Sequence, residues 1–236
     1  MKIEAYGLSD IGLERETNQD AFVSDIQSNI FIVADGIAGS QHGEVASALA
    51  CKTIHADLKK NQKAPHPEDA LEAAILHANQ NILNQAKANH SLWGMATTVC
   101  VLWIQNETAY LTHAGDSRIY YYQSPHLWQL TEDHTVAEQH NKLGLSLETV
   151  DPSDKNKITK YLGSEELLSI EIEKKVLSPN ESYLICTDGL SSQLASGEIS
   201  KILNLKKTDV VCDTLVKQAN ARGGIDNVTT VFINIL

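Results

Sequence analysis

The chain contains few of the residues that stabilise small secreted proteins. It has four cysteines in 236 residues, and no two of them form a C-x-x-C pair. They are Cys51, Cys100, Cys186 and Cys212. Their wide spacing argues against a disulfide framework or a thiolate zinc site, and it favours small buried side chains in a reduced compartment.

Apolar runs long enough for export or membrane insertion are also lacking. The segment from Met1 to Glu4 carries charge and has no apolar core of a secretory signal. The longest apolar stretch, residues 95–104, contains two threonines and is about half as long as a membrane helix. We therefore expect a cytoplasmic protein that has no contact with a membrane.

Basic residues are scarce as well, with 19 Lys and Arg against 30 Asp and Glu and a formal net charge of -11. Binding to nucleic acid needs a basic face that displaces counterions, so we expect no such partner. Low-complexity segments, repeats and flexible linkers are absent, while 42% apolar residues are enough for a core. The length and the even composition predict a single monomeric domain over residues 1–236.

Short runs rich in Val, Ile, Thr and Tyr, separated by turn residues, predict strands. These runs are 3–8, 21–26, 30–34, 96–104, 108–113, 118–122, 127–130, 170–176, 183–186 and 228–235. Apolar periodicity predicts helices over 44–60, 67–89, 135–143 and 208–221. Thr135 and Glu138 have the spacing of a capping box. An early and a late pair of helices with consecutive strands between them predict an α+β fold with antiparallel sheets.

Several aspartates stand beside these predicted strands, each flanked by glycine or another small residue. They are Asp20, Asp35, Asp116, Asp188 and Asp226. A neighbouring glycine lets the backbone approach a bound group or offer a carbonyl ligand. Converging carboxylates would repel one another unless cations lay between them, and oxygen ligands suit Mg²⁺ or Mn²⁺. Asp-Gly and Asp-Asn are also ordinary turn dipeptides, so the pattern by itself leaves a metal site and simple turns both open.

The aspartates belong to motifs that follow one another along the whole chain. The motifs are Gly12–Asp20, Asp35–Gly39 with Gly43–Ser47, Gly94–Thr98, His113–Arg118, Leu130–His134, Cys186–Leu190 and Gly223–Thr229. In this order the chain resembles the bacterial PP2C-type (PPM) metal-dependent protein serine/threonine phosphatases. It departs from that pattern at Ala38, where glycine is usual, and at Ile37, where some members carry histidine. His42 is close in sequence, but we expect it to be a loop or helix-cap residue.

The resemblance implies a central sandwich of two antiparallel β-sheets flanked by pairs of antiparallel α-helices. It also implies two core Mn²⁺ or Mg²⁺ ions bridged by Asp35. The Gly36 carbonyl, Asp188 and Asp226 would complete the ligands of these ions. Asp116, together with Asp188, would hold a third and weaker ion.

The same resemblance assigns the catalytic roles. Asp20 would orient metal-bound water, and Arg15 would bind the substrate phosphate with its planar fork, which lysine lacks. The implied activity is hydrolysis of phosphoserine and phosphothreonine in proteins by a water activated between two metals. The substrates would be targets of a bacterial Ser/Thr kinase. Residues 144–163 would form a variable flap that influences substrate choice.

Other functions fit the sequence less well. A catalytically silent relative that binds a partner is the main alternative, but it would have no need to keep every carboxylate. A Ser-His-Asp hydrolase is disfavoured because Gly189–Gln193 is not a G-x-S-x-G elbow. A P-loop NTPase is excluded because the loop between Gly36 and Gly43 lacks the Gly-Lys-Ser/Thr ending.

Overall fold

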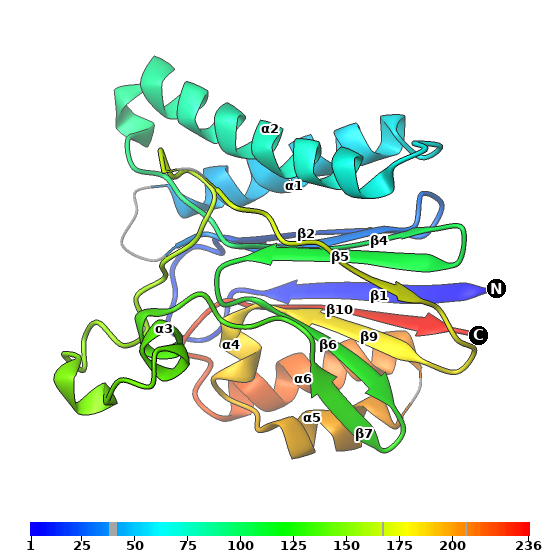
Figure 1. Ribbon diagram of the computed structural model, residues 1–236. Helices are drawn as coiled ribbons and strands as arrows, with labels where there is room; N and C mark the ends of the chain where they lie inside the picture. The colour runs from blue at the N-terminus through cyan, green and yellow to red at the C-terminus, as the bar shows by residue number, and fades with distance from the viewer. Residues whose placement is uncertain (38–41, 167, 206) are drawn as a thin grey trace.

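The computed structural model describes residues 1–37, 42–166, 168–205 and 207–236, and it shows two stacked sheets between two layers of helices (Figure 1). One sheet has the order β1 (Ile3–Asp10), β10 (Val228–Ile235), β9 (Ser182–Cys186), β6 (Arg118–Gln123) and β7 (His126–Gln129). The other has the order β2 (Asp20–Asp25), β3 (Ile30–Asp35), β4 (Val99–Gln105), β5 (Thr108–Ala114) and β8 (Glu173–Val176). The pairings between these strands are antiparallel.

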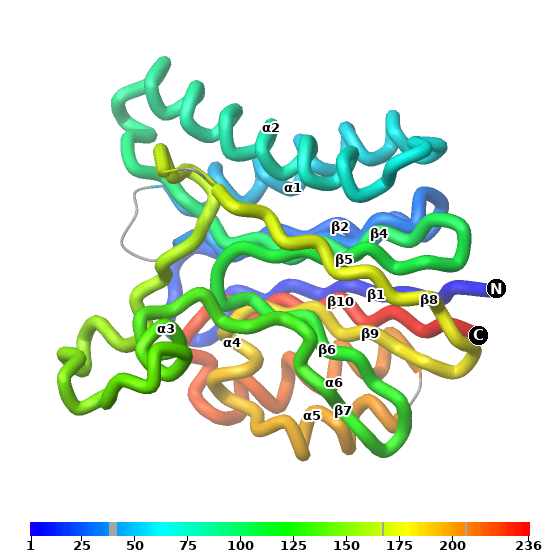
Figure 2. The backbone as a smooth tube through the Cα atoms, in the orientation of Figure 1, coloured from blue at the N-terminus to red at the C-terminus, as the bar shows by residue number. Residues whose placement is uncertain are grey.

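Helices cover the outer face of each sheet, as the tube trace also shows (Figure 2). On the β2–β8 sheet lie α1 (Gly43–Lys60) and α2 (Pro67–Ala88), and on the other sheet lie α5 (Ser196–Leu203) and α6 (Thr208–Ala221). Short α3 (Val136–Lys142) and α4 (Asp188–Ser191) stand at one end of the sandwich (Figure 1). The single-turn 3-10 helices η1 (His90–Leu92) and η2 (Leu147–Thr149) complete the elements of the described chain. The predicted α+β sandwich is confirmed.

The stacking explains why the central strands do not alternate between apolar and polar residues. Every residue of β10 is buried, as are Ile30 to Ala34 of β3. One face of each sheet packs against the other sheet, where Phe31, Tyr183 and Val231 meet, and the opposite face packs against helices. The edge strands β7 and β8 have one covered face at most, and most of their residues are exposed or half-buried. A continuous apolar run is therefore compatible with an antiparallel sheet that is covered on both sides.

The helix layers are amphipathic and close two further cores. Ile54 and Leu58 of α1 and Ile75 of α2 pack with Trp103 of β4, and all four are almost fully buried. Burying one such aliphatic side chain stabilises the fold by about 1.5–3 kcal/mol. The four cysteines are buried and free, as the spacing predicted. In the part of the chain that the structure describes, no helix combines the length and the apolar character needed to span a membrane.

Some of the helices predicted from the sequence differ from those in the structure. The late helix pair is α5 with α6, and the predicted helix at 135–143 is the separate α3. Helix α5 escaped detection because it is short and begins with Ser196-Gly197, both weaker helix formers than alanine. The capping box at α3 is only half formed. Thr135 accepts from the Glu138 amide, but the Thr135 amide donates to the Asp133 carbonyl.

Asp25 at the end of β2 attaches α1 to the sheet. Its Oδ2 accepts a hydrogen bond from His55 Nε2 at 2.8 Å, and Lys59 Nζ lies 3.7 Å away. Burial raises the pKa of this carboxyl, but the hydrogen bonds from His55 and Ser28 outweigh burial and bring it down to about 2. Because the folded-state pKa is depressed, the ionised carboxylate stabilises the fold above about pH 4, and this contribution is lost as the pH falls through about 2.

We expect Asp25→Asn to lower the free energy of unfolding at neutral pH by about 1–2 kcal/mol. The difference from the wild type should shrink between about pH 4 and pH 2, which urea unfolding at a series of pH values measures. Asp213→Asn is the matched control, because Asp213 is 52% exposed and its ion-pair partner among the described residues is Lys217 on the same helix. It should change stability by less than about 0.5 kcal/mol. Equal losses for both variants would contradict a special role for Asp25.

Candidate metal centre

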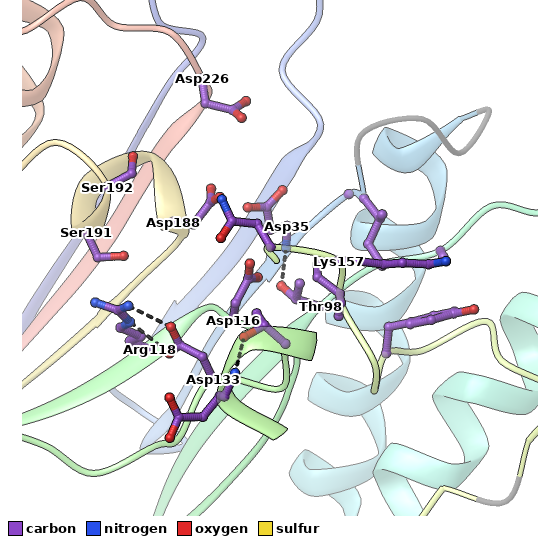
Figure 3. A pocket seen from close by; sticks show the side chains of 18 of the residues that line it. Asp35, Thr98, Asp116, Arg118, Asp133, Lys157, Asp188, Ser191, Ser192 and Asp226 are labelled. Atoms are coloured by element: carbon purple, nitrogen blue, oxygen red, sulfur yellow. Dashed lines mark hydrogen bonds and ion pairs between the residues drawn. The ribbon is translucent and has the colours of Figure 1, made fainter. Parts of the chain in front are cut away.

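The predicted carboxylates arise at strand ends that meet at one end of the sandwich. Asp35 ends β3, Asp116 lies in the turn from β5 to β6, Asp188 follows β9 at the start of α4, and Asp226 precedes β10. All four side chains, with Gly36, line one pocket of about 910 Å³ (Figure 3). The register of the two sheets therefore brings together residues that are up to 191 positions apart in the sequence, from 35 to 226.

The carboxylates form an open arrangement, not a closed cage. In Figure 3, Asp35, Asp116 and Asp188 gather at the centre of the pocket, and Asp226 stands apart on the segment before β10. Within the described ranges, no three His, Cys, Asp or Glu side chains already surround a common point closely enough to hold an ion.

Asp20 lies behind Asp35, its partner in the β2–β3 register, and is not part of the pocket wall. Its Oδ2 accepts a hydrogen bond from Thr187 Oγ1 at 3.0 Å. Its Oδ1 is buried and has no hydrogen-bond partner among the described residues. A buried polar atom without a partner costs about 1–3 kcal/mol. The orphaned oxygen therefore indicates that the site is built for a further polar or cationic group.

Burial and like charge disfavour the ionised forms of these carboxyls. Burial raises the pKa of Asp20 to about 7, and the hydroxyls of Thr229 and Thr187 offset only part of this. Burial and then the charge of Asp188 raise the pKa of Asp116 to about 7. The pKa of Asp35 lies well above its ordinary value, through burial and the neighbouring carboxylates, and that of Asp188 is raised in the same way. An oxygen-only donor set with unfavourable negative charge fits hard divalent cations.

Arg15 is placed at the rim of this pocket by an ion pair. Its Nη2 lies 2.7 Å from Asp226 Oδ2, and its side chain is 37% exposed. Neither Arg15 nor its neighbours from Glu14 to Thr17 are among the residues that line the pocket. The residue predicted to bind the phosphate is thus paired with a predicted metal ligand that lines the pocket.

A single amide side chain holds the loop that carries Arg15. Asn227 Nδ2 donates to the carbonyls of Ile11 and Thr17, at 2.9 and 3.1 Å, and its Oδ1 accepts from the Gln19 amide at 2.8 Å. The two ends of the loop are thereby attached to the residue that follows Asp226. Sequence reasoning assigned no role to Asn227, although it stands inside the last motif.

Two threonines of the central motif position Asp35. The Asp35 amide donates to Thr98 Oγ1 at 3.1 Å, and Thr97 Oγ1 donates to the Asp35 carbonyl at 2.8 Å. The Thr98 hydroxyl also hydrogen-bonds the Ser117 hydroxyl at 2.7 Å, which connects β3 to the turn that carries Asp116. The Thr-Thr pair in the Gly94–Thr98 motif was the available signal for this role.

A second support for Asp116 comes from residues of the Leu130–His134 motif. Arg118 makes a two-pronged ion pair with Asp133, at 2.9 and 2.6 Å, and both residues line the pocket. His134 Nδ1 accepts from the Gly115 amide at 3.1 Å, and its ring stacks on His113 with centroids 4.3 Å apart. Burial, followed by the charge of His113, lowers the pKa of His134 to about 3. The ring therefore stays neutral and able to accept this bond.

The remaining sequence expectations have mixed outcomes. The flap contributes Lys157, Ile158 and Tyr161 to the pocket wall. His42 is the residue before α1, has φ of 64°, contacts Glu44 at 3.1 Å and does not line the pocket, which fits a cap residue. Ala38 and Gly39 lie outside the described residues.

Comparisons with known proteins agree on one class. The family model described as protein phosphatase 2C matches residues 14–222. The serine/threonine phosphatase stp of Listeria innocua is 30% identical over 234 residues, which cover 95% of this chain and 93% of that protein. The structure of the S. agalactiae serine/threonine phosphatase superposes with a TM-score of 0.89 at 27% identity, and each chain is covered to 100%. The catalytic domain of the serine/threonine phosphatase PstP, solved with two manganese ions, gives 0.87 at 28% identity, covering 98% of this chain and 97% of that one.

The fold, the carboxylate pocket and these relatives define the class of protein as a metal-dependent phosphoprotein phosphatase. The chain belongs to the protein phosphatase 2C family and is a protein serine/threonine phosphatase that depends on divalent metal. The resemblance drawn from the motifs is thereby confirmed. None of the relatives described here favours the silent alternative, because each is named as a phosphatase.

The close approach of α4 to the last strand offers a test of the site's geometry. A Cβ at Gly189 would overlap the Asn227 carbonyl oxygen, so in Gly189→Ala either α4 or the segment of Asn227 must shift, which changes the spacing of Asp188 and Asp226. We expect a loss of at least about tenfold in Mn²⁺ affinity, measured by calorimetry, and a destabilisation of about 1–3 kcal/mol.

The matched control for this variant is Gly197→Ala in α5. A Cβ at Gly197 would meet nothing within 4 Å, and alanine is the better helix former by about 1 kcal/mol. Gly197→Ala should retain the wild-type affinity. Wild-type Mn²⁺ binding by Gly189→Ala would show that the spacing of Asp188 and Asp226 is unimportant.

Proposed function

We propose that residues 1–236 act as one catalytic domain in which Asp35, the Gly36 carbonyl, Asp188 and Asp226 hold two core metal ions. Asp116, with Asp188, holds a third and weaker ion. The observation that carries this proposal is the convergence of four carboxylates from four separate segments on one pocket. Their burial and mutual repulsion, which raise the pKa of Asp35, Asp116 and Asp188, support it further.

When bound, the ions supply a water of lowered pKa as the nucleophile and offset the negative charge of the phosphate. Asp20 accepts a hydrogen bond from Thr187 through one oxygen, so its other, orphaned oxygen is available to accept from a water and orient it. The cysteines cannot replace this water as nucleophile, because burial raises the pKa of each thiol.

Arg15 binds the phosphate of the substrate in this proposal. Its guanidinium presents a planar fork that matches two phosphate oxygens, a geometry that lysine lacks. In the structure the guanidinium contacts Asp226, so it must exchange this carboxylate for the phosphate. The exchange is favourable once the Asp226 carboxylate has another positive partner, since neither charge is then left unpaired.

The donor set accepts either Mn²⁺ or Mg²⁺, because both prefer oxygen ligands. We further propose that the substrates are proteins phosphorylated by a Ser/Thr kinase and that the enzyme acts as a cytoplasmic monomer without nucleic-acid partners. The net charge of -11 supports the last point, because nucleic acid would be repelled.

Hydrolysis of phosphopeptides tests the assignment directly. Phosphoserine and phosphothreonine peptides should be hydrolysed with Mn²⁺, and a chelator should abolish the activity because the uncatalysed reaction is extremely slow. Asp188→Ala should lower kcat by at least about a hundredfold, since Asp188 is proposed to bind both the core ions and the third ion. Asp213→Asn on the surface of α6 serves as the control and should be fully active. Activity that survives both chelation and Asp188→Ala would overturn the metal site.

Metal binding should depend on pH. Because the pKa of Asp116 is raised to about 7, and those of Asp35 and Asp188 also lie above their ordinary values, protons must leave before a cation can bind these carboxylates. The apparent Mn²⁺ affinity should fall about tenfold per pH unit below about pH 7 for each proton displaced. Calorimetry in buffers of different ionisation enthalpy measures the protons released, and Asp116→Asn should release fewer. An affinity that stays constant between about pH 6 and pH 8 would contradict the raised pKa values.

A further inference from the structure

A second and smaller cavity adjoins the carboxylate pocket. Its volume is about 170 Å³, and it lies between the C-terminal half of α2 and the segments around Trp93 and Glu165. Gly94 and Gly163 line both this cavity and the carboxylate pocket, so the two lie side by side. The apolar members of its wall are Ile82, Leu83, Ala86, Trp93 and Met95, and together we call them the apolar subsite.

The chemistry of this cavity favours an uncharged, apolar occupant. The ionic residues in its wall are Lys87 and Glu165, and they pair with each other at 3.2 Å. Trp93 is 60% exposed, and its ring stacks on His90 with centroids 6.2 Å apart. Tryptophan rings that border an apolar pocket in this way are typical anchors of binding surfaces.

The wall of the cavity is fixed by backbone contacts. Gly163 donates its amide to Asn79 Oδ1 at 2.7 Å, and Asn79 Nδ2 donates to the Ser164 carbonyl at 3.1 Å. Thr97 and Leu162 exchange backbone hydrogen bonds of 3.0 and 2.9 Å just beyond it. At Gly94, which lines both cavities and has φ of +78°, a Cβ would meet nothing within 4 Å, so the space beside this residue is open.

The distance between the two cavities fits a peptide that spans both. The Thr98 amide donates to the Asp35 carbonyl at 2.8 Å, and Gly94 precedes Thr98 by four residues. At about 3.3 Å per extended residue, the distance from Gly94 to Thr98 is at most about 13 Å. An extended substrate rises by the same amount per residue, so a side chain within about four positions of the phosphorylated residue reaches the cavity.

We propose that the apolar subsite binds one apolar side chain of the phosphoprotein substrate, within about four positions of the phosphorylated Ser or Thr. A cavity of about 150 Å³ holds a benzene molecule, so the volume here suits one leucine or phenylalanine side chain. The inference rests on the proposed position of the phosphate beside Asp35 and Arg15. It makes Trp93 a specificity-determining residue, outside the metal centre.

The test is a series of phosphothreonine peptides of small polar residues, with one leucine moved through each of the five positions on either side. Leucine at one or two positions should raise kcat/KM about tenfold over the peptide with alanine there. Trp93→Ala, which removes a wall, and Ala86→Leu, which fills the cavity, should both abolish this preference. Trp128→Ala is the matched control, because Trp128 is 46% exposed on β7 and lines neither cavity.

Hydrolysis of para-nitrophenyl phosphate separates the two proposals, because this substrate has no neighbouring residue to occupy the subsite. All three variants should hydrolyse it at the wild-type rate. A flat leucine profile with intact, Mn²⁺-dependent hydrolysis of para-nitrophenyl phosphate would overturn the subsite and leave the metal centre standing. A preference that persists in Trp93→Ala would overturn it as well. A flat leucine profile would also overturn the subsite if sedimentation showed a wild-type dimer that dissociates in Trp93→Ala.

Discussion

The electrostatic repulsion between carboxylates held at one end of the β-sandwich is the constraint on which the site depends. Asp35, Asp116 and Asp188 lie half-buried at the wall of one pocket, and burial together with like charge raises the pKa of each carboxyl. Folding stability is a small difference between large terms. A cluster of like charges therefore persists only where the rest of the fold fixes the positions of its side chains. In the proposed function, bound divalent cations would relieve this repulsion and attract a phosphate dianion.

Hydrogen bonds between side chains and the backbone hold this geometry in place. Thr97 and Thr98 hold Asp35 from both sides, and Asn227 attaches the loop of Arg15 to the segment of Asp226. Glycines allow the remaining close approaches. A Cβ at Gly36 would collide with the backbone of Gly43, so the start of α1 can lie against the end of β3 only because both residues lack side chains. The site is therefore carried by the rigid ends of strands, with the flap and the apolar subsite arranged around it.

Much of the fold could be predicted because apolar patterning is strong in the long elements. Residues 228–235 and 208–221 form the predicted strand and helix exactly, and the other long elements differ from their predicted ranges by a few residues. The short helices α4 and α5 were missed because they contain too few residues to show an apolar periodicity. The boundary of β4 was wrong for another reason. Residues 96–98 are as apolar and β-branched as a strand, but their pairing with β5 ends at Val99, and Thr97 instead forms isolated bridges with Gly36 and Leu162.

The sequence by itself determined the class of protein, because ordered motifs at the right spacing record the chemistry of the site. It could not show that the carboxylates share one pocket, since that depends on strand order and register between residues far apart in the chain. Nor could it assign Arg118, Asp133, His134 and Asn227 to the support of Asp116 and Arg15. The apolar subsite was wholly invisible, because its wall joins α2, Trp93 and Gly163, and an apolar residue on a helix is ordinarily part of the core. Proximity in space is a property of the packed chain, and only the tertiary structure decided it.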